Sequence, residues 1–66
     1  MNLILNGKKT PFTPSETLAQ LLQRLGIHPH KLAVELNEAI IPANAYANTP
    51  LTDGDRIEII QFVGGG

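Results

Sequence analysis

The chain has 66 residues, a formal net charge of −1, 42% hydrophobic and 17% charged residues, and no cysteine or tryptophan. This length allows one domain, which without cysteine must rely on a hydrophobic core and not on disulfides or thiolate metal sites. The near-neutral charge argues against nucleic acid as a partner, because nucleic-acid-binding proteins carry a basic surface. No apolar run is long enough to span a membrane, and the start MNLILNGKK lacks the pattern of a secretory signal. We therefore expect a cytoplasmic single domain.

Side chains able to do catalytic chemistry are few. The chain holds one tyrosine and two histidines, both in His28-Pro29-His30. An active site needs a concave pocket with several convergent polar groups, and so small a core leaves little room for one. Two histidines beside a proline, with no nearby cysteine or carboxylate, are too few ligands for a closed metal site, so we interpret them as part of a solvent loop. The sequence favours a carrier or binding module over an enzyme, with no bound cofactor or metal.

The first predicted element is a hairpin over residues 1–12. Residues 3–5, Leu-Ile-Leu, favour a strand, and Asn6-Gly7 follows as a strong signal for a type I′ turn, in which both central residues have positive φ. Pro11 in the returning strand indicates an edge position, because proline donates no hydrogen bond to a neighbouring strand.

An amphipathic helix is predicted next. Its apolar positions follow the spacing of one helix face: Leu18, Leu21, Leu22 and Leu25. Two N-caps compete, Thr13 and Thr17, each followed three residues later by the Glu or Gln of a capping box. We favour Thr17 because the apolar period starts there. Gly26 is expected to end the helix in the left-handed conformation, with Ile27 packing back on Leu22.

The remaining chain predicts three strands and one ambiguous segment. The strands are expected over residues 32–36, 39–41 and 56–63. Asn37-Glu38 looks like a tight turn between the first two of them. The segment 43–50 has no clear period and suggests no more than a short helical turn around Tyr46, which we interpret as a residue at the rim of the core.

This element order predicts an α+β fold in which one helix covers one face of a mixed sheet of four to five strands. The expected core joins the inward side chains of the sheet to the leucine face of the helix: Leu3, Leu5, Leu32, Val34, Leu36, Ile57, Ile59, Leu18, Leu21, Leu22 and Leu25. With the first and last strands paired in the middle, the fold would be a β-grasp (ubiquitin-like) domain, although apolar alternation alone does not separate it from other small α+β sheets. We expect this domain to span residues 1–63, followed by a flexible glycine tail at 64–66.

The last predicted strand has apolar residues on both faces. Ile60 and Phe62 are expected to point away from the helix, where a solvated sheet face is normally polar. An exposed apolar patch on a small protein usually marks a partner surface. We predict that this surface consists of Ile4, Ile60, Phe62 and Val63, with Ile4 beside the other residues. The alternative is that segment 43–51 folds over the patch.

The sequence ends in Gly64-Gly65-Gly66. Glycine tails are common in linkers, but glycine also has no Cβ, so such a tail can extend through a narrow channel that would exclude side chains. A terminal carboxylate has a pKa of about 3.3–3.7 and is ionised at neutral pH. It is unreactive until it is activated, for example as an acyl-adenylate, which sulfur or nitrogen nucleophiles can attack.

Over its whole length the chain resembles the bacterial sulfur carriers of thiamine (thiazole) biosynthesis, a ubiquitin-like β-grasp family. The segments that carry the resemblance are Val34-Glu35-Leu36-Asn37, Ile40-Ile41-Pro42, the run Asp53 to Ile59, and the ending Val63-Gly64-Gly65-Gly66. Members often have a basic residue after the proline at position 42 and a tryptophan near position 46. Here these positions hold Ala43 and Tyr46, so the contacts of this loop are expected to differ. The chemistry that the resemblance implies for the tail is unaffected.

The resemblance implies a set of partners and a chemistry centred on Gly66. An adenylyltransferase similar to ubiquitin-activating enzymes would use ATP to adenylate the Gly66 carboxylate. Sulfur from a cysteine desulfurase or another donor would replace AMP, and thiazole synthase would take the sulfur from the resulting thiocarboxylate. Gly64 and Gly65 would thread the tail into each partner. ATP would be bound by the activating partner, and the carrier itself would hold no cofactor.

Three other functions remain open at this stage. The small subunit of molybdopterin synthase uses the same chemistry, but it is usually longer and ends in two glycines. A β-grasp interaction module would bind partners through its sheet without using its terminus. A ubiquitin-type protein modifier would form an isopeptide in place of a thiocarboxylate.

Overall fold

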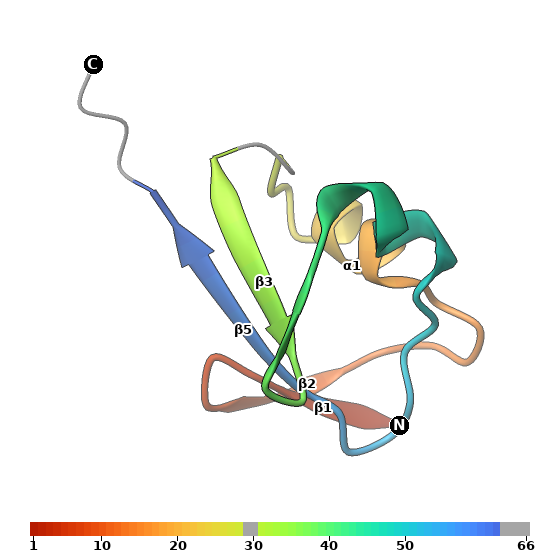
Figure 1. Cartoon of the computed structure of the whole chain (residues 1–66). Helices are drawn as coiled ribbons and strands as arrows, with labels where there is room; N and C mark the ends of the chain where they lie inside the picture. The colour runs from red at the N-terminus through yellow and green to blue at the C-terminus, as the bar shows by residue number, and fades with distance from the viewer. Residues whose placement is uncertain (29–30, 63–66) are drawn as a thin grey trace.

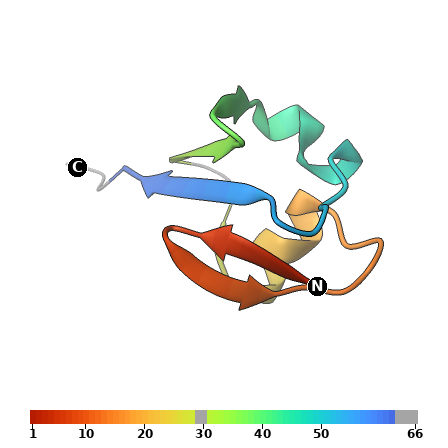
Figure 2. The ribbon, with the colours of Figure 1, turned by 90° about the horizontal axis from the view of Figure 1, so that it is seen from below.

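The computed structural model describes residues 1–28 and 31–62. Its elements in chain order are β1 (Asn2–Leu5), β2 (Lys8–Pro11), α1 (Leu18–Arg24), β3 (Leu32–Leu36), β4 (Ala39–Ile41), the 3-10 helix η1 (Ala43–Asn48) and β5 (Arg56–Gln61). The strands form one sheet in the order β2-β1-β5-β3-β4, in which β1 is parallel to β5 and the other pairs are antiparallel. Both helices lie on one side of the sheet (Figure 1 and Figure 2). The predicted α+β fold, with the first and last strands paired in the middle, is confirmed.

Two hairpin turns hold residues in the left-handed region. At the β1–β2 turn the φ angles of Asn6 and Gly7 are 47° and 83°, and at the β3–β4 turn those of Asn37 and Glu38 are 50° and 72°. Both predicted turns are confirmed, although Glu38 is a residue type that rarely takes this conformation. The Asn37 side chain holds the second turn in place: its Oδ1 accepts from the Arg56 N–H at 3.0 Å and its Nδ2 donates to Asp55 at 3.0 Å.

Helix α1 begins and ends as the sequence predicts. The N–H of Gln20 donates to Oγ1 of Thr17 at 3.2 Å, and the Thr17 N–H donates back to the Gln20 side chain at 2.8 Å, which completes a capping box. At the other end Gly26 has φ 73°, and the Ile27 N–H donates to the Leu22 carbonyl at 2.9 Å, the main-chain bond of a Schellman motif. Thr17 is therefore the N-cap, while the rival position at Thr13 lies in a turn that precedes the helix.

The core lies between the sheet and the two helices. Its buried hydrophobic residues are Leu3, Phe12, Leu18, Leu21, Leu22, Val34, Tyr46, Leu51 and Ile57. The other predicted strand positions Leu5, Leu32, Leu36 and Ile59 are partly buried and pack against this cluster. The prediction for Leu25 was wrong: its side chain is 37% exposed, because Leu25 is the C-cap and the chain turns away from the helix axis there. Ile27 packs against the core in its stead.

The segment after β4 packs on the helix side of the sheet. Tyr46 of η1 is buried in the core, deeper than the predicted rim position. The main chain beyond η1 is tied to the start of α1, since the Leu18 N–H donates to the Thr49 carbonyl at 2.8 Å and the Leu51 N–H to that of Glu16 at 2.9 Å. This segment therefore helps to seal the core and leaves the opposite face of the sheet uncovered.

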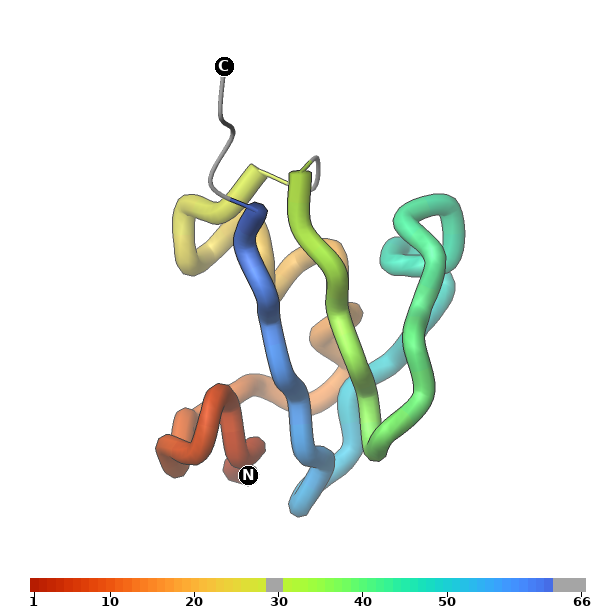
Figure 3. Tube along the Cα trace, turned by 60° about the vertical axis from the view of Figure 1, so that its left-hand side comes forward, coloured from red at the N-terminus to blue at the C-terminus, as the bar shows by residue number. Residues whose placement is uncertain are grey.

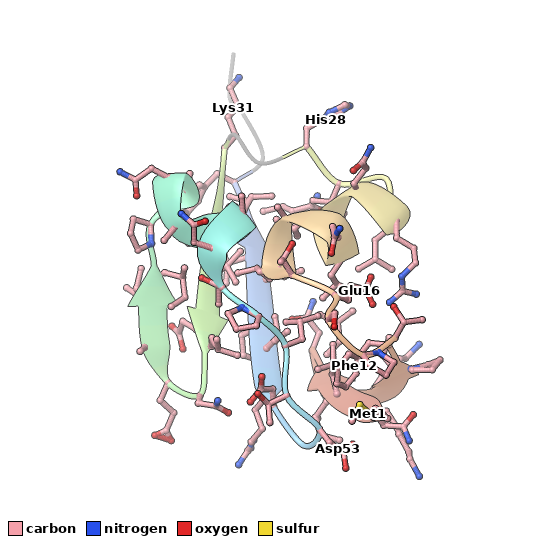
Figure 4. The ribbon with its side chains drawn as sticks, turned by 90° about the vertical axis from the view of Figure 1, so that its right-hand side faces the viewer. Met1, Phe12, Glu16, His28, Lys31 and Asp53 are labelled. Carbon is pink, nitrogen blue, oxygen red and sulfur yellow. The ribbon has the colours of Figure 1, made fainter. Side chains whose placement is uncertain are left out.

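A partly buried ion pair joins the start of α1 to its last turn. Glu16, which Figure 4 shows where the chain enters α1, is 7% exposed, and its Oε2 lies 2.8 Å from Nε of Arg24. The same guanidinium donates to the Pro11 carbonyl at the end of β2, at 3.0 Å. The hydrogen bond from Arg24 lowers the pKa of Glu16, aided by the Thr13 N–H, although burial of the carboxyl opposes the shift. The pair thus fastens the hairpin to the helix.

Candidate functional site

The central strand β5 leads directly to the glycine tail. β5 pairs with β1 on one side and β3 on the other, and its pairing with β3 extends to the Phe62 N–H, which donates to the Lys31 carbonyl at 2.8 Å. In Figure 1 and Figure 3 this end of β5 lies far from the N-terminus. Val63 and the tail Gly64-Gly65-Gly66 lie outside the described residues, as does the predicted boundary between domain and tail.

The sheet face opposite the helices carries an apolar patch at the end of β5. The side chains of Ile60 and Phe62 are 48% and 58% exposed. We call these two residues the tail-end patch. Their predicted exposure is confirmed, and the alternative, in which segment 43–51 covers them, was wrong because that segment packs on the other face.

Ile4 does not belong to the tail-end patch. It lies on the same face and is 36% exposed, but its partner across the sheet is Arg56, the first residue of β5. Because a strand rises about 3.3 Å per residue, Ile60 lies roughly 13 Å further along. The prediction that Ile4 lies beside Ile60 was wrong, since the parallel pairing of β1 with β5 is confined to the start of β5.

Two glutamates lie between Ile4 and the tail-end patch on the outer face. Glu58 of β5 lies opposite Glu35 of β3, so both side chains are on the outer face, between Ile4 and Ile60 along the sheet. Neither carboxylate takes part in an ion pair within residues 1–28 and 31–62. The outer face is therefore apolar near the tail and charged in the middle.

Sequence reasoning missed one exposed apolar residue on this face, Ile40. Its side chain is 71% exposed, and its partner across the β3–β4 hairpin is Glu35. The signal was present in the sequence: Ile40 and Ile41 are consecutive in a strand, so only one of them can face the core. Ile41 is the residue that packs against the core. Ile40 therefore adds a further apolar position to the outer face, on the edge strand β4.

The helix side bears a groove of about 470 Å³ between α1 and η1. Most of its lining is apolar or small: Ala19, Leu22, Gly26, Ile27, Ala43 and Ala47, together with the polar side chains of Gln23, His28 and Tyr46. Burial raises the pKa of Tyr46, so its hydroxyl stays protonated at neutral pH. Among the described residues, the lining contains no serine, threonine, cysteine, lysine or carboxylate side chain. The lining therefore gives no support to a catalytic site.

Metal-ligating side chains do not gather in the described part of the chain, where no three His, Cys, Asp or Glu residues come together. His28 is exposed, and Pro29 and His30 of the predicted solvent loop lie outside the described residues. Within the same ranges, neither helix has the length and hydropathy to cross a bilayer.

Comparison with known families identifies the chain. The model of the ThiS family matches residues 3–66, a range that includes the glycine tail. The chain belongs to the ThiS family. Relatives in this family include proteins named sulfur carrier protein ThiS, and a solved ThiS structure shares the β-grasp fold.

Two ThiS proteins agree with the chain in length, and one of them is a solved structure with the same fold. The sulfur carrier protein ThiS of Bacillus subtilis is 38% identical over 65 residues, which cover 97% of this chain and 98% of that protein. The crystal structure of the thiamine biosynthesis protein (ThiS) from Geobacter metallireducens superposes with a TM-score of 0.84 and 35% identity, and the match covers all of both chains. The chain also matches a thiazole synthase from Paramagnetospirillum magneticum with 44% identity, but it spans only 20% of that protein's length.

Proposed function

We propose that this ThiS-family chain carries sulfur to the thiazole ring of thiamine, with Gly66 as the residue that bears it. The observation that carries the proposal is the family match through residue 66, which takes in the whole glycine tail. The exposed tail-end patch supports it, because Ile60 and Phe62 stand immediately before that tail and offer a docking surface. In this proposal the carrier has no catalytic residues of its own.

The proposed chemistry takes place at one carboxylate. A carboxylate oxygen of Gly66 attacks the α-phosphorus of ATP on an activating enzyme, pyrophosphate leaves, and an acyl-adenylate forms. The terminal sulfur of a persulfide, supplied through a cysteine desulfurase or another donor, then attacks the acyl carbon and expels AMP, which leaves an acyl disulfide. A thiol attacks the donor's sulfur of this S–S bond, forms a disulfide with it and releases the acyl sulfur. The product is a thiocarboxylate on Gly66. Gly64 and Gly65 contribute by having no side chains, which lets the activated carbon enter a narrow active site.

Thiazole synthase is the proposed recipient of the sulfur. Two proteins named thiazole synthase, from Paramagnetospirillum magneticum and Magnetococcus marinus, contain a segment that matches all of this chain with 44% and 39% identity. A carrier-like segment within the same polypeptide as the synthase supports a working partnership between the two. The same relatives favour thiamine over molybdopterin as the destination. Serial exchange between partners calls for small, transient interfaces of about 1,200 Å² or less.

The intact mass of the protein, isolated without a C-terminal tag from cells grown without thiamine, tests this function. We expect a fraction heavier by the difference between one sulfur and one oxygen atom, localised to Gly66 by fragmentation. A matched sample should be incubated with the candidate activating enzyme and ATP, to detect exchange of pyrophosphate into ATP. Protein that shows neither the heavier mass nor the exchange would overturn the proposal.

A variant that lacks Gly66 provides the control. It should fold like the parent, because the tail follows the last core strand, and it should support no pyrophosphate exchange. A shortened variant that still supports exchange would show that the activated carboxylate is not that of Gly66.

A further inference from the structure

The two sides of β5 are paired over different lengths. On the β3 side the pairing runs from the Asn37 N–H, which donates to the Arg56 carbonyl, to the Phe62 N–H, which donates to Lys31. On the β1 side, strand pairing covers only Arg56 and Ile57. The hairpin then turns away at Asn6, and Figure 3 shows the far part of β5 with β3 beside it and the hairpin confined to the other end.

The side chain of Asn6 ends the pairing on the β1 side. Its Oδ1 accepts from the Ile59 N–H at 2.7 Å, and its Nδ2 donates to the Ile59 carbonyl at 3.4 Å. This amide takes the place of a strand residue for one more step along β5. Beyond Ile59 the described part of the chain provides no strand on this side.

Gln61 therefore has an open main-chain edge. In a strand, the N–H and C=O of one residue point to one neighbouring strand, and those of the next residue point to the other side. Because the N–H of Phe62 points to β3, the N–H and carbonyl of Gln61 point to the side where Asn6 binds Ile59. Gln61 is exposed, and no hydrogen bond joins these two groups to residues 1–28 or 31–62. One donor and one acceptor thus have no partner among the described residues, three positions before Gly64.

The edge strand β2, on the same side of the sheet, is protected in the usual way, and the open edge of β5 is not. Edge strands are commonly guarded by lysine and proline, which discourage pairing with another chain. Strand β2 carries Lys8, Lys9 and Pro11. The open edge at Gln61 is flanked instead by the exposed apolar side chains of Ile60 and Phe62.

We propose that an extended segment of thiazole synthase pairs with the main chain of Gln61 and adds a strand to the open edge of β5. This inference rests on the proposed carrier function. A glycine tail offers a partner no side chains, so main-chain hydrogen bonds are the available means of recognition, and strand addition supplies them in register. Pairing at Gln61 would fix the end of β5 against the synthase.

The test removes the Gln61 donor without changing any side chain. The chain is short enough to assemble by chemical synthesis with a methyl group on the main-chain nitrogen of Gln61. We expect its Kd for the organism's thiazole synthase to rise about tenfold, the equivalent of one lost main-chain hydrogen bond (about 1.4 kcal/mol). The matched control is N-methyl-lysine at Lys9. That residue lies in a non-hydrogen-bonded pair with Ile4, so its N–H points outward from the protected edge, and its Kd should equal that of the parent.

Thermal unfolding of both N-methylated chains should match the parent. If N-methylation at Gln61 destabilises the fold, an ester bond in place of the same amide removes the donor without adding a methyl group, and the same tenfold loss is expected. Equal affinity of the parent and both Gln61 analogues would overturn the inference. Self-association of the parent that the Gln61 analogue abolishes would also overturn it, by assigning the edge to a second copy.

Failure of this inference is distinguishable from failure of the proposed function. If the parent protein acquires sulfur on Gly66 and binds thiazole synthase, but N-methylation at Gln61 leaves the Kd unchanged, the proposed function stands and the strand-addition model is wrong. If the parent protein acquires no sulfur and does not bind thiazole synthase, both the proposed function and the strand-addition model are wrong.

Discussion

The two faces of β5 differ sharply in exposure. Ile57 and Ile60 are the same residue type, three positions apart on one strand, yet Ile57 is fully buried and Ile60 is 48% exposed. The inner face is covered by α1 and η1, while the outer face has no covering element in the described chain. The two faces of this strand therefore differ in role: the inner Ile57 packs in the core, and the outer apolar residues remain exposed to solvent.

The largest expected effect comes from shortening the inner isoleucine. Ile57→Ala should lower the free energy of unfolding by about 2–5 kcal/mol, because it removes buried methyl groups and leaves a cavity in a small core. Ile60→Ala, the matched change on the outer face, should cost less than about 1 kcal/mol. Urea denaturation of the two variants checks this. Equal losses would mean that the two faces are equally important for stability and would break the comparison.

The outer face should show its importance in binding. Phe62→Asp places a charge in the tail-end patch and should raise the Kd for thiazole synthase about 30-fold, as expected for an aromatic residue at the centre of an interface. Its unfolding free energy should stay within about 0.5 kcal/mol of the parent, since Phe62 is 58% exposed. Titration calorimetry measures the Kd. Ile4→Asp is the matched control, because Ile4 lies on the same face but outside the tail-end patch. Unchanged affinity in Phe62→Asp would remove the patch from the docking surface.

The smallest expected effect concerns the ion pair on the helix side. Glu16→Gln should lower the free energy of unfolding by about 1–2 kcal/mol at pH 7, less than for a fully buried pair, because the Arg24 side chain is 45% exposed. The pKa of Glu16 is lowered in the folded state from its ordinary value of 4.5. Its contribution is therefore complete above that pH and is lost as the pH falls through the folded-state value.

Denaturation at a series of pH values between about 7 and 3 measures this contribution. The difference between the parent and Glu16→Gln should be constant near neutrality and shrink toward the acidic end. A difference that grows as the pH falls would mean that the hydrogen bond from Arg24 does not favour the ionised form.

Local features of the fold were predictable because they depend on neighbours in the sequence. The Asn6-Gly7 turn, the Thr17 cap and the left-handed Gly26 each follow from conformations that a few adjacent residues prefer. The exposure of Ile60 and Phe62 was predictable too, since a strand with apolar residues on both faces must leave one face outward unless another layer covers it.

Features that depend on register were not predictable. The apolar pattern placed Ile4 on the correct face, but its level along β5 depends on how far the parallel pairing extends, and alternation has no information about that distance. The burial of Tyr46 and Leu51 and the exposure of Leu25 depend on which segment packs against a two-turn helix. No short-range pattern in the sequence encodes that choice.

The strands, the helix and its ends, the two hairpin turns and the chemistry available to a glycine tail follow from side-chain period, caps and the absence of Cβ, all of which can be read from the amino-acid sequence. The tertiary structure decided where η1 packs, how the outer face divides into apolar and charged parts, and where pairing on one side of β5 stops. The physical reason is that each of these is a distance between segments remote in sequence, such as the one closed by Asn6 and Ile59, which lie 53 positions apart.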